Sequence, residues 1–168
     1  RGLVVGGVVA GLIVGLVVRR IVGSLAGKRL GGLVVRVVGA LAVLRRELPD
    51  VTLTVAGPPS WPLPGGVPDG VEHLGPVPRE VVGELLDSHD LFVMPSRLEG
   101  FGIAFVEALA RGLPCVARDA FAMPEIVRPG IGGALVGSED PAELASVVAA
   151  ALADDGLYER CAAAAPSV

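Results

Sequence analysis

The sequence predicts a three-layer α/β domain in which a parallel sheet lies between helices. Short apolar runs alternate along the chain with longer segments whose apolar residues recur at helical spacing, and Gly and Pro mark the junctions. The run at residues 90–96 has an unbroken apolar centre, which is typical of a parallel strand covered on both faces. A length of 168 residues suits one such domain.

The beginning of the chain is unusual in composition. The first 46 residues are almost wholly Val, Gly, Leu, Ala, Ile and Arg, and the whole chain lacks Asn and Gln. Either high genomic GC content or an error in residue assignment accounts for such a bias. The apolar run at residues 2–18 is rich in Val and Gly, so we favour buried strands or poorly assigned sequence over a transmembrane helix, which stays the alternative. Residues 1–168 form one domain in this interpretation, in which residues 1–15 are either a linker or a poorly assigned segment.

The first predicted strand of the sheet is residues 16–23. A Gly-rich loop follows at 24–32, and apolar residues at helical spacing then predict a helix over 33–48 that Pro49 and Asp50 terminate. Because this loop follows a strand, we expect it at the edge of the sheet where α/β proteins bind ligands.

The middle of the chain continues the alternation of strands and helices. Alternating β-branched residues predict a strand at 51–57, and a loop rich in Pro and Gly separates it from a second strand at 71–75. Residues 76–80 then lead into a helix that ends near Ser88.

The second half begins with the strand at 90–96. A helix is predicted at 103–111, where Gly and Pro follow its last turn, and a strand at 114–118. A loop at 119–123 precedes a short helix begun by Pro124. After a last strand at 132–136, Asp140 serves as the N-cap of a helix that runs through the Ala-rich tail to Pro166.

Two carboxylates lie in and after the turn that follows the strand at 90–96. Glu99 stands in the turn, and Glu107 lies inside the helix that follows. Gly100 and Gly102 permit a close approach to the backbone, and the first amides of a helix attract an anion. Singly, each Glu is an ordinary residue of an exposed helix face; their spacing and flanks favour a functional interpretation.

The segment from Glu99 to Glu107 resembles the E-x7-E signature of retaining family 4 glycosyltransferases. Residues 94–98 and 124–127 resemble the usual flanks of that signature, and the similarity runs from about residue 48 to 135. The resemblance implies a Rossmann-like domain, the C-terminal, donor-nucleotide half of a two-domain GT-B enzyme. It also implies an N-terminal acceptor domain that lies outside this chain, so that the domain by itself is inactive.

The resemblance further implies transfer of a hexosyl group from a UDP- or GDP-linked sugar, with retention of configuration and without an obligatory metal or other cofactor. Glu99 is the implied catalytic residue, which binds hydroxyls of the donor sugar near the reacting carbon. Glu107 is implied to hold the ribose. The implied donor contacts in the turn and at the start of the helix are Gly100, Phe101, Gly102 and Ile103.

The resemblance also implies which residues contact the diphosphate and the base of the donor. Lys28 and Arg29 are the candidate cations for the diphosphate, although solvated loop cations are an equal alternative. Ser24 stands where the family usually carries an Arg, and a hydroxyl offers only a neutral hydrogen bond. The backbone at Val77 is implied to lie beside the base.

A second departure lies at Phe121, where relatives usually place a small Gly. Its ring either narrows the space near the donor sugar or packs inward. Together with Ser24, it supports an alternative function, a catalytically inactive nucleotide-binding or interaction module on the same scaffold.

Charge, cysteines and histidines exclude other classes of function. Eight of the 14 Lys and Arg lie in residues 1–46, which hold no acid, but no aromatic residues are interleaved with them, so nucleic-acid binding is not expected. Cys115 and Cys161 lack disulfide or metal spacing and are predicted to be free thiols in a reducing cytoplasm, with peripheral membrane association as the less favoured alternative. His73 and His89 lack partners for a hydrolase triad or a zinc site, so we expect structural roles.

Overall fold

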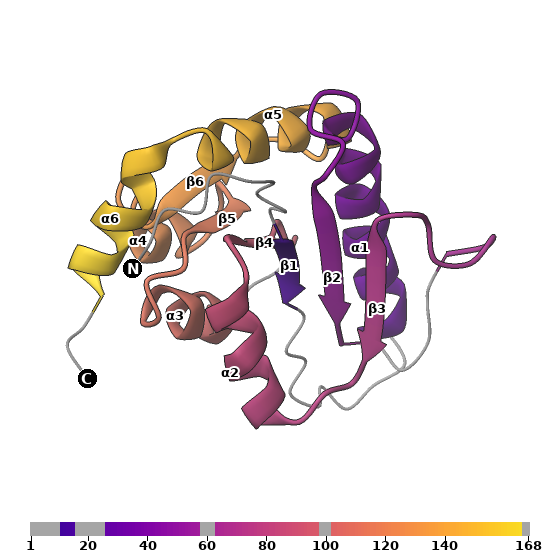
Figure 1. Ribbon diagram of the computed structural model, residues 1–168, viewed down its shortest axis with the longest axis horizontal. Coiled ribbons are helices and arrows are strands. Elements are labelled where there is room, and N and C mark those ends of the chain that lie inside the picture. Colours follow the sequence, from indigo (N-terminus) through magenta and orange to yellow (C-terminus); the bar gives the residue numbers. More distant parts are fainter. Residues whose placement is uncertain (1–10, 16–25, 58–62, 98–101, 166–168) are drawn as a thin grey trace.

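The computed structural model describes residues 11–15, 26–57, 63–97 and 102–165, and side chains from Gly32 onward within these ranges. The described residues form one parallel sheet in the order β3-β2-β1-β4-β5-β6 (Figure 1). Its strands are β1 (Gly11–Gly15), β2 (Thr52–Ala56), β3 (Val71–Gly75), β4 (Leu91–Met94), β5 (Cys115–Arg118) and β6 (Gly133–Val136). The predicted α/β class with a parallel sheet is therefore confirmed.

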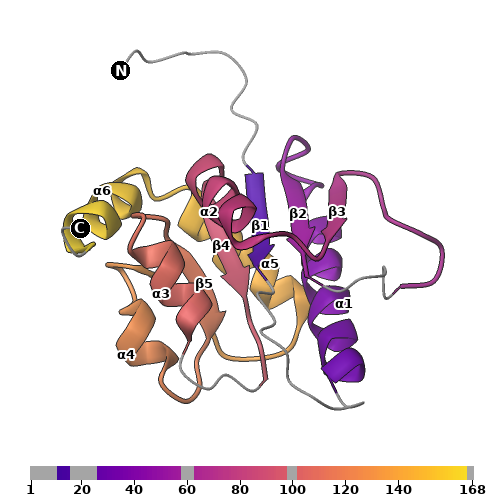
Figure 2. The ribbon, with the colours of Figure 1, turned by 90° about the horizontal axis from the view of Figure 1, so that it is seen from below.

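Helices cover both faces of this sheet. α1 (Ala26–Leu44) and α5 (Pro141–Leu152) pack together on one face, and α2 (Arg79–Ser88) and α3 (Ile103–Leu109) lie on the other (Figures 1 and 2). The short α4 (Met123–Val127) packs against β5 and β6, and α6 (Asp155–Ala164) ends the described chain.

The strand order reverses at the centre of the sheet. β1 pairs with β2 on one side and with β4 on the other, so the chain builds outward first to β3 and then to β6. This reversal is the topological switch point, beside which open α/β sheets bind ligands at the carboxyl ends of the strands. β1 and β4 point to the same edge, from which the chain enters α1 and α3 (Figure 2).

The core holds this edge in place through apolar packing. Leu53 on β2, Val93 on β4 and Val116 on β5 are fully buried. The rings of Phe92 on β4 and Phe105 on α3 meet edge to face, with centroids 5.3 Å apart. α3 is thereby anchored to the strand that precedes it.

Three predicted boundaries differ most from the structure. The predicted first strand, residues 16–23, lies outside the described residues, and β1 comes earlier, inside the apolar run. The predicted loop at 24–32 is wrong from residue 26 onward, because α1 begins at Ala26. Its glycines suggested a loop, yet a helix tolerates them at a cost of about 1 kcal/mol each when it gains packing, as α1 does against α5.

The third difference is in the Ala-rich tail, where the single predicted helix is wrong. α5 ends at Leu152, and Asp154 then caps α6 by accepting a hydrogen bond from the amide of Gly156 at 3.2 Å. An acidic N-cap thus begins a new helix in a sequence whose alanines alone favour one continuous helix.

The cysteines and one histidine have the structural roles expected of them. Cys115 and Cys161 are free and buried, and burial raises the pKa of both thiols. In His89, Nδ1 lies 2.8 Å from the carbonyl oxygen of Leu85, and Nε2 lies 2.9 Å from the hydroxyl of Thr54. The carbonyl can only accept, so Nδ1 carries a hydrogen; in a neutral ring Nε2 then accepts from the Thr54 hydroxyl.

None of the helices in the described ranges combines the length and the apolar character that a membrane crossing requires.

Candidate functional site

The candidate site lies at the carboxyl edge of the sheet, around the start of α3. Gly102 caps this helix with left-handed backbone angles, φ +60° and ψ +30°. A side chain there would be strained, and its Cβ would come within 2.9 Å of atoms of Met123 and Ile126. Gly at this position therefore has a packing reason within the chain, and Ile103 follows it as an exposed residue.

Glu107 lies one turn further along α3, and Arg79 of α2 is its partner. Nη2 of Arg79 donates to Oε1 of Glu107 at 3.2 Å. The Arg79 side chain is 80% exposed and that of Glu107 is 30% exposed. Because an ion pair this exposed contributes little to stability, the carboxylate is open to exchange Arg79 for another hydrogen-bond donor.

Arg79 was not among the residues predicted from the sequence. It begins α2, directly after the loop from β3 that carries the half-buried Val77. Its position at the first turn of a helix after a strand is a signal in the sequence, but its partner lies 28 residues away. The ion pair therefore joins two strand–helix connections, the one from β3 to α2, which also carries Val77, and the one from β4 to α3.

The other predicted donor residues fall in two groups. The backbone of Lys28 and Arg29 lies near the start of α1 rather than in a loop, so the predicted loop cations stand in a helix. Ser24, Glu99, Gly100 and Phe101 lie outside the described residues.

Phe121 follows β5 at the same edge. It has a positive φ of 56°, which is rare for an aromatic residue, and its side chain is 64% exposed. Of the two alternatives for this ring, inward packing is therefore wrong. The backbone conformation itself favours Gly at this position.

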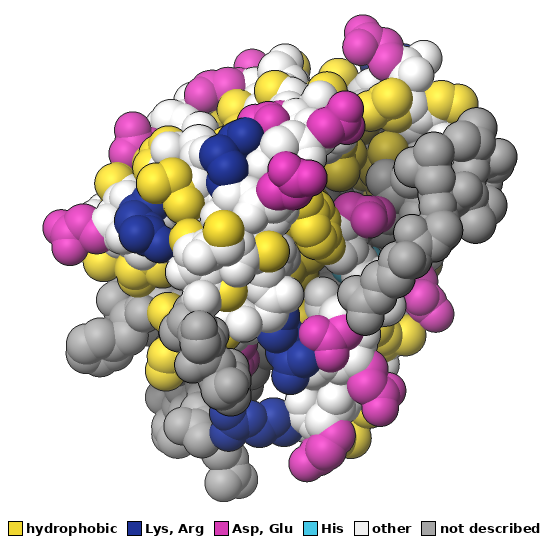
Figure 3. All heavy atoms as spheres, turned by 60° about the vertical axis from the view of Figure 1, so that its left-hand side comes forward, with side chains coloured by type: hydrophobic (Ala, Val, Ile, Leu, Met, Phe, Trp, Pro, Cys, Tyr) yellow, Lys and Arg dark blue, Asp and Glu magenta, His cyan; other side chains and the backbone are white. Residues whose placement is uncertain are grey.

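Charged side chains elsewhere are mixed rather than grouped by sign. On the face shown in Figure 3, the coloured Lys and Arg side chains form small separate groups between acidic and hydrophobic ones. Within the described ranges, His, Cys, Asp and Glu side chains nowhere gather in a group of three that would hold a metal ion.

Comparison with curated proteins finds similar glycosyltransferases. The D-inositol 3-phosphate glycosyltransferase of Mycolicibacterium vanbaalenii is 34% identical over 163 residues, covering 82% of this chain and 36% of that protein. The protein of that name from Geodermatophilus obscurus is 39% identical over 88 residues, covering 52% of this chain and 20% of that protein. The chain thus spans about a third or less of the length of these relatives.

Solved structures agree on the fold. A crystal structure of Anabaena Alr3699/HepE in complex with UDP and glucose matches 93% of this chain and 42% of its own, with a TM-score of 0.69 and 23% identity. The C-terminal domain of the glycosyl transferase group 1 family protein LpcC from Francisella tularensis matches 91% of this chain and 80% of its own, with a TM-score of 0.68 and 21% identity.

The family model described as "Glycosyl transferases group 1" matches residues 34–168, which include the sheet from β2 onward and the whole of α3. The chain therefore belongs to the glycosyl transferases group 1 family.

Proposed function

We propose that this chain is the donor-binding half of a retaining, metal-independent glycosyltransferase. In this proposal it binds a UDP- or GDP-linked sugar, and an N-terminal domain outside this chain binds the acceptor of the hexosyl group. The observation that carries the proposal is the partly exposed Glu107 carboxylate, which α3 holds at the carboxyl edge of the sheet. The fold neighbour whose structure contains UDP and glucose supports a sugar nucleotide as ligand.

Glu107 binds the ribose in this account. A carboxylate has two oxygens that accept hydrogen bonds, which suits the two adjacent hydroxyls of a ribose. Its present partner, Arg79, is held by one exposed contact at 3.2 Å. Exchange of that contact for the diol costs little, since surface ion pairs contribute about 0–1 kcal/mol.

The remaining donor contacts follow the family pattern. Glu99 binds hydroxyls of the donor sugar. The backbone amides of Gly100, Phe101, Gly102 and Ile103 donate hydrogen bonds to the sugar or to the phosphates. The backbone at Val77 borders the base.

The diphosphate lies at the start of α1. Lys28 and Arg29 supply cations there, Ser24 supplies a neutral hydrogen bond, and the positive end of the helix dipole adds to them. Charge that develops on the leaving diphosphate is stabilised by the same groups.

A second function is favoured by two residues. Ser24 weakens the diphosphate site, and Phe121 places an exposed ring where the backbone conformation favours Gly. Both fit a module that binds nucleotides without turnover.

Calorimetry tests donor binding directly. Titration of UDP, GDP, ADP and their glucose derivatives should show saturable binding of at least one sugar nucleotide. Binding should be lost in Glu107→Ala and kept in Glu159→Ala, which alters an exposed Glu on α6. If none of these nucleotides or nucleotide sugars binds, the proposal of a donor-binding site is wrong.

Turnover separates the two functions and requires the full-length gene product. D-Inositol 3-phosphate, taken from the names of the relatives, is the first acceptor to try. The active enzyme should give a product with the donor's anomeric configuration by NMR, and excess EDTA should leave the rate unchanged. If the protein binds a nucleotide sugar but neither transfers the sugar to an acceptor nor hydrolyses the donor, the inactive module is favoured.

A further inference from the structure

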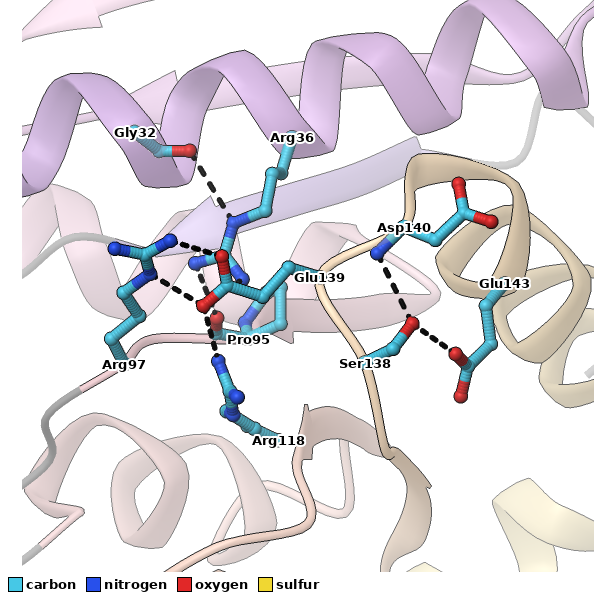
Figure 4. A network of polar contacts seen from close by, with 9 residues as sticks. All are labelled: Gly32, Arg36, Pro95, Arg97, Arg118, Ser138, Glu139, Asp140 and Glu143. Atoms are coloured by element: carbon cyan, nitrogen blue, oxygen red, sulfur yellow. Dashed lines mark hydrogen bonds and ion pairs between the residues drawn. The ribbon is translucent and has the colours of Figure 1, made fainter.

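Three arginines from three different elements converge on one carboxylate at the carboxyl side of the sheet (Figure 4). Arg36 comes from α1, Arg97 follows β4, and Arg118 ends β5. The carboxylate belongs to Glu139, which follows β6. We call these four residues the arginine cluster. They are distinct from the residues proposed to hold the nucleotide.

Two of the arginines hydrogen-bond Glu139. Arg97 donates through Nε to Oε1 and through Nη2 to Oε2, a two-point fork on the carboxylate. Arg118 donates through Nη1 to Oε1 at 2.7 Å. The hydrogen bonds from Arg97 and then Arg118 lower the pKa of Glu139 to about 2, so this carboxylate is charged at neutral pH.

Arg36 is the buried member, with a side chain only 12% exposed. Its Nη2 donates to the carbonyl oxygen of Pro95 at 3.0 Å, which fixes the guanidinium against the end of β4. Its Nη1 is buried without a hydrogen-bond acceptor in the part of the chain that the structure describes, and it lies 3.9 Å from Oε1 of Glu139. A buried guanidinium N–H without an acceptor has lost hydration that nothing in these contacts replaces.

The charges within the arginine cluster do not balance. Three guanidiniums face one carboxylate, and an arginine side chain stays protonated in proteins. Burial is the largest cause that lowers the pKa of Arg36. The charge of Glu139 raises this pKa, and the charges of Arg97 and Arg118 lower it. An oxyanion would offset this repulsion and give the Nη1 of Arg36 an acceptor.

Neighbouring side chains in the sequence hold the loop that carries Glu139. Glu143 accepts a hydrogen bond from the amide of Gly137 at 3.0 Å and another from the hydroxyl of Ser138. Asp140 caps α5 through the amide of Ala142 at 2.9 Å. These acids are engaged within their own loop, so of the acids drawn in Figure 4 only Glu139 faces the three arginines.

We propose that the arginine cluster is a phosphate-binding site, at which a phosphate group competes with the Glu139 carboxylate for the guanidiniums of Arg36, Arg97 and Arg118. Planar guanidinium forks match the oxygens of phosphate as they match those of a carboxylate. Glu139 is partly exposed and Arg97 largely so, which leaves the exchange open to solvent. The proposal does not depend on the nucleotide function of Glu107.

Removal of the competing carboxylate is the decisive change. Inorganic phosphate is titrated into the wild-type chain and into Glu139→Gln by calorimetry, in buffer free of other oxyanions. The variant keeps the size of the side chain but not its charge, so phosphate affinity should rise roughly tenfold or more. Adding Arg97→Gln to that variant should weaken phosphate binding roughly tenfold, because a charged donor pair is lost.

Arg160→Gln is the matched control, since Arg160 also pairs with an exposed carboxylate, that of Asp154 at the N-cap of α6. It should leave phosphate affinity unchanged. Circular dichroism melting confirms that each variant is folded. If folded Glu139→Gln binds phosphate no more tightly than wild type, the arginine cluster serves only to hold its loops together and the proposal is wrong.

A competition experiment with UDP shows whether the phosphate group that binds here belongs to the nucleotide donor or to another molecule. Phosphate is titrated into Glu139→Gln with and without saturating UDP. Displacement by UDP assigns the arginine cluster to the donor's own diphosphate, whereas unchanged phosphate binding assigns it to a separate phosphorylated small molecule. Either result supports the site, and UDP binding itself reports separately on the proposed function.

Discussion

Arg79 at the start of α2 and Glu107 within α3 form an ion pair between two different strand–helix connections of the sheet. Their side chains meet at 3.2 Å although 28 residues separate them in the chain. The arginine begins α2 after β3, and the glutamate lies in α3 after β4. Since the pair is exposed, Glu107 is available to a ligand that approaches this edge.

Substitutions of these two residues should affect nucleotide binding in opposite directions. Glu107→Gln removes the charge from the oxygens proposed to bind the diol and should weaken sugar-nucleotide binding roughly tenfold to a hundredfold. Arg79→Ala frees the carboxylate and should keep or tighten binding, at a stability cost below about 1 kcal/mol. Calorimetry and urea denaturation of both variants check this. Equal weakening by the two substitutions would assign the binding role to the pair rather than to Glu107.

Gly102→Ala tests the close packing at the start of α3. The new Cβ meets left-handed backbone strain and atoms of Met123 and Ile126, so we expect a loss of about 1–3 kcal/mol in unfolding free energy. Gly32→Ala is the control, because that Gly is exposed in α1 with open space around it. It should stabilise the fold by about 0.5–1 kcal/mol. A neutral Gly102→Ala would contradict the steric account.

Phe105→Ala tests how the core positions α3. The ring is fully buried against Phe92, and its removal should cost about 3–5 kcal/mol in the free energy of unfolding. Val106→Ala, one residue further on the exposed side of α3, should stay within about 0.5 kcal/mol of wild type. Denaturant unfolding compares the two, and similar costs would mean that α3 is not anchored through Phe105.

The sequence predicted those elements whose ends carry local signals. β3 has its predicted bounds, and α3 begins at the predicted Ile103. α1 began earlier than predicted because its stability comes from packing on α5, which outweighs the glycines in its first turns. The break between α5 and α6 depends on one cap, Asp154, in an otherwise helix-favouring tail.

The site was predictable only where a single segment carries it. Glu107 was proposed from the spacing of one strand–turn–helix motif, and its role stays a prediction. The pairing of Arg79 with Glu107 and the convergence of Arg36 and Arg97 on Glu139 depend on strand order, since the partners lie far apart in the chain. An isolated Arg after a strand is an ordinary surface residue until the sheet order shows which other residues share its edge.

Acid should weaken the contribution of Glu139 to stability. The pKa of this carboxyl is about 2 in the folded chain against an ordinary 4.5, so the folded state binds fewer protons. Its contribution is complete above about pH 4.5 and is lost as the pH falls toward 2.

The stability difference between wild type and Glu139→Gln should therefore be constant from pH 5 to 7 and shrink below about pH 4.5. When both proteins also carry Arg97→Gln, the difference should shrink less at low pH, because the hydrogen bonds from Arg97 are the largest cause of the lowered pKa of Glu139. Urea denaturation across this pH range, in phosphate-free buffer, measures both. A difference that stays the same at pH 3 as at pH 6 would contradict the assigned contacts.

The central claim is that a sugar nucleotide binds at the carboxyl edge of the sheet beside α3. Amide NMR spectra of the chain during a UDP titration test it most directly, with GDP and ADP as parallel titrations. The account predicts saturable shifts at Val77, Gly102 and Ile103 for at least one nucleotide, unchanged amides in α6, and loss of these shifts in Glu107→Ala. Shifts confined to other parts of the chain, or none with any of the three nucleotides, would contradict it.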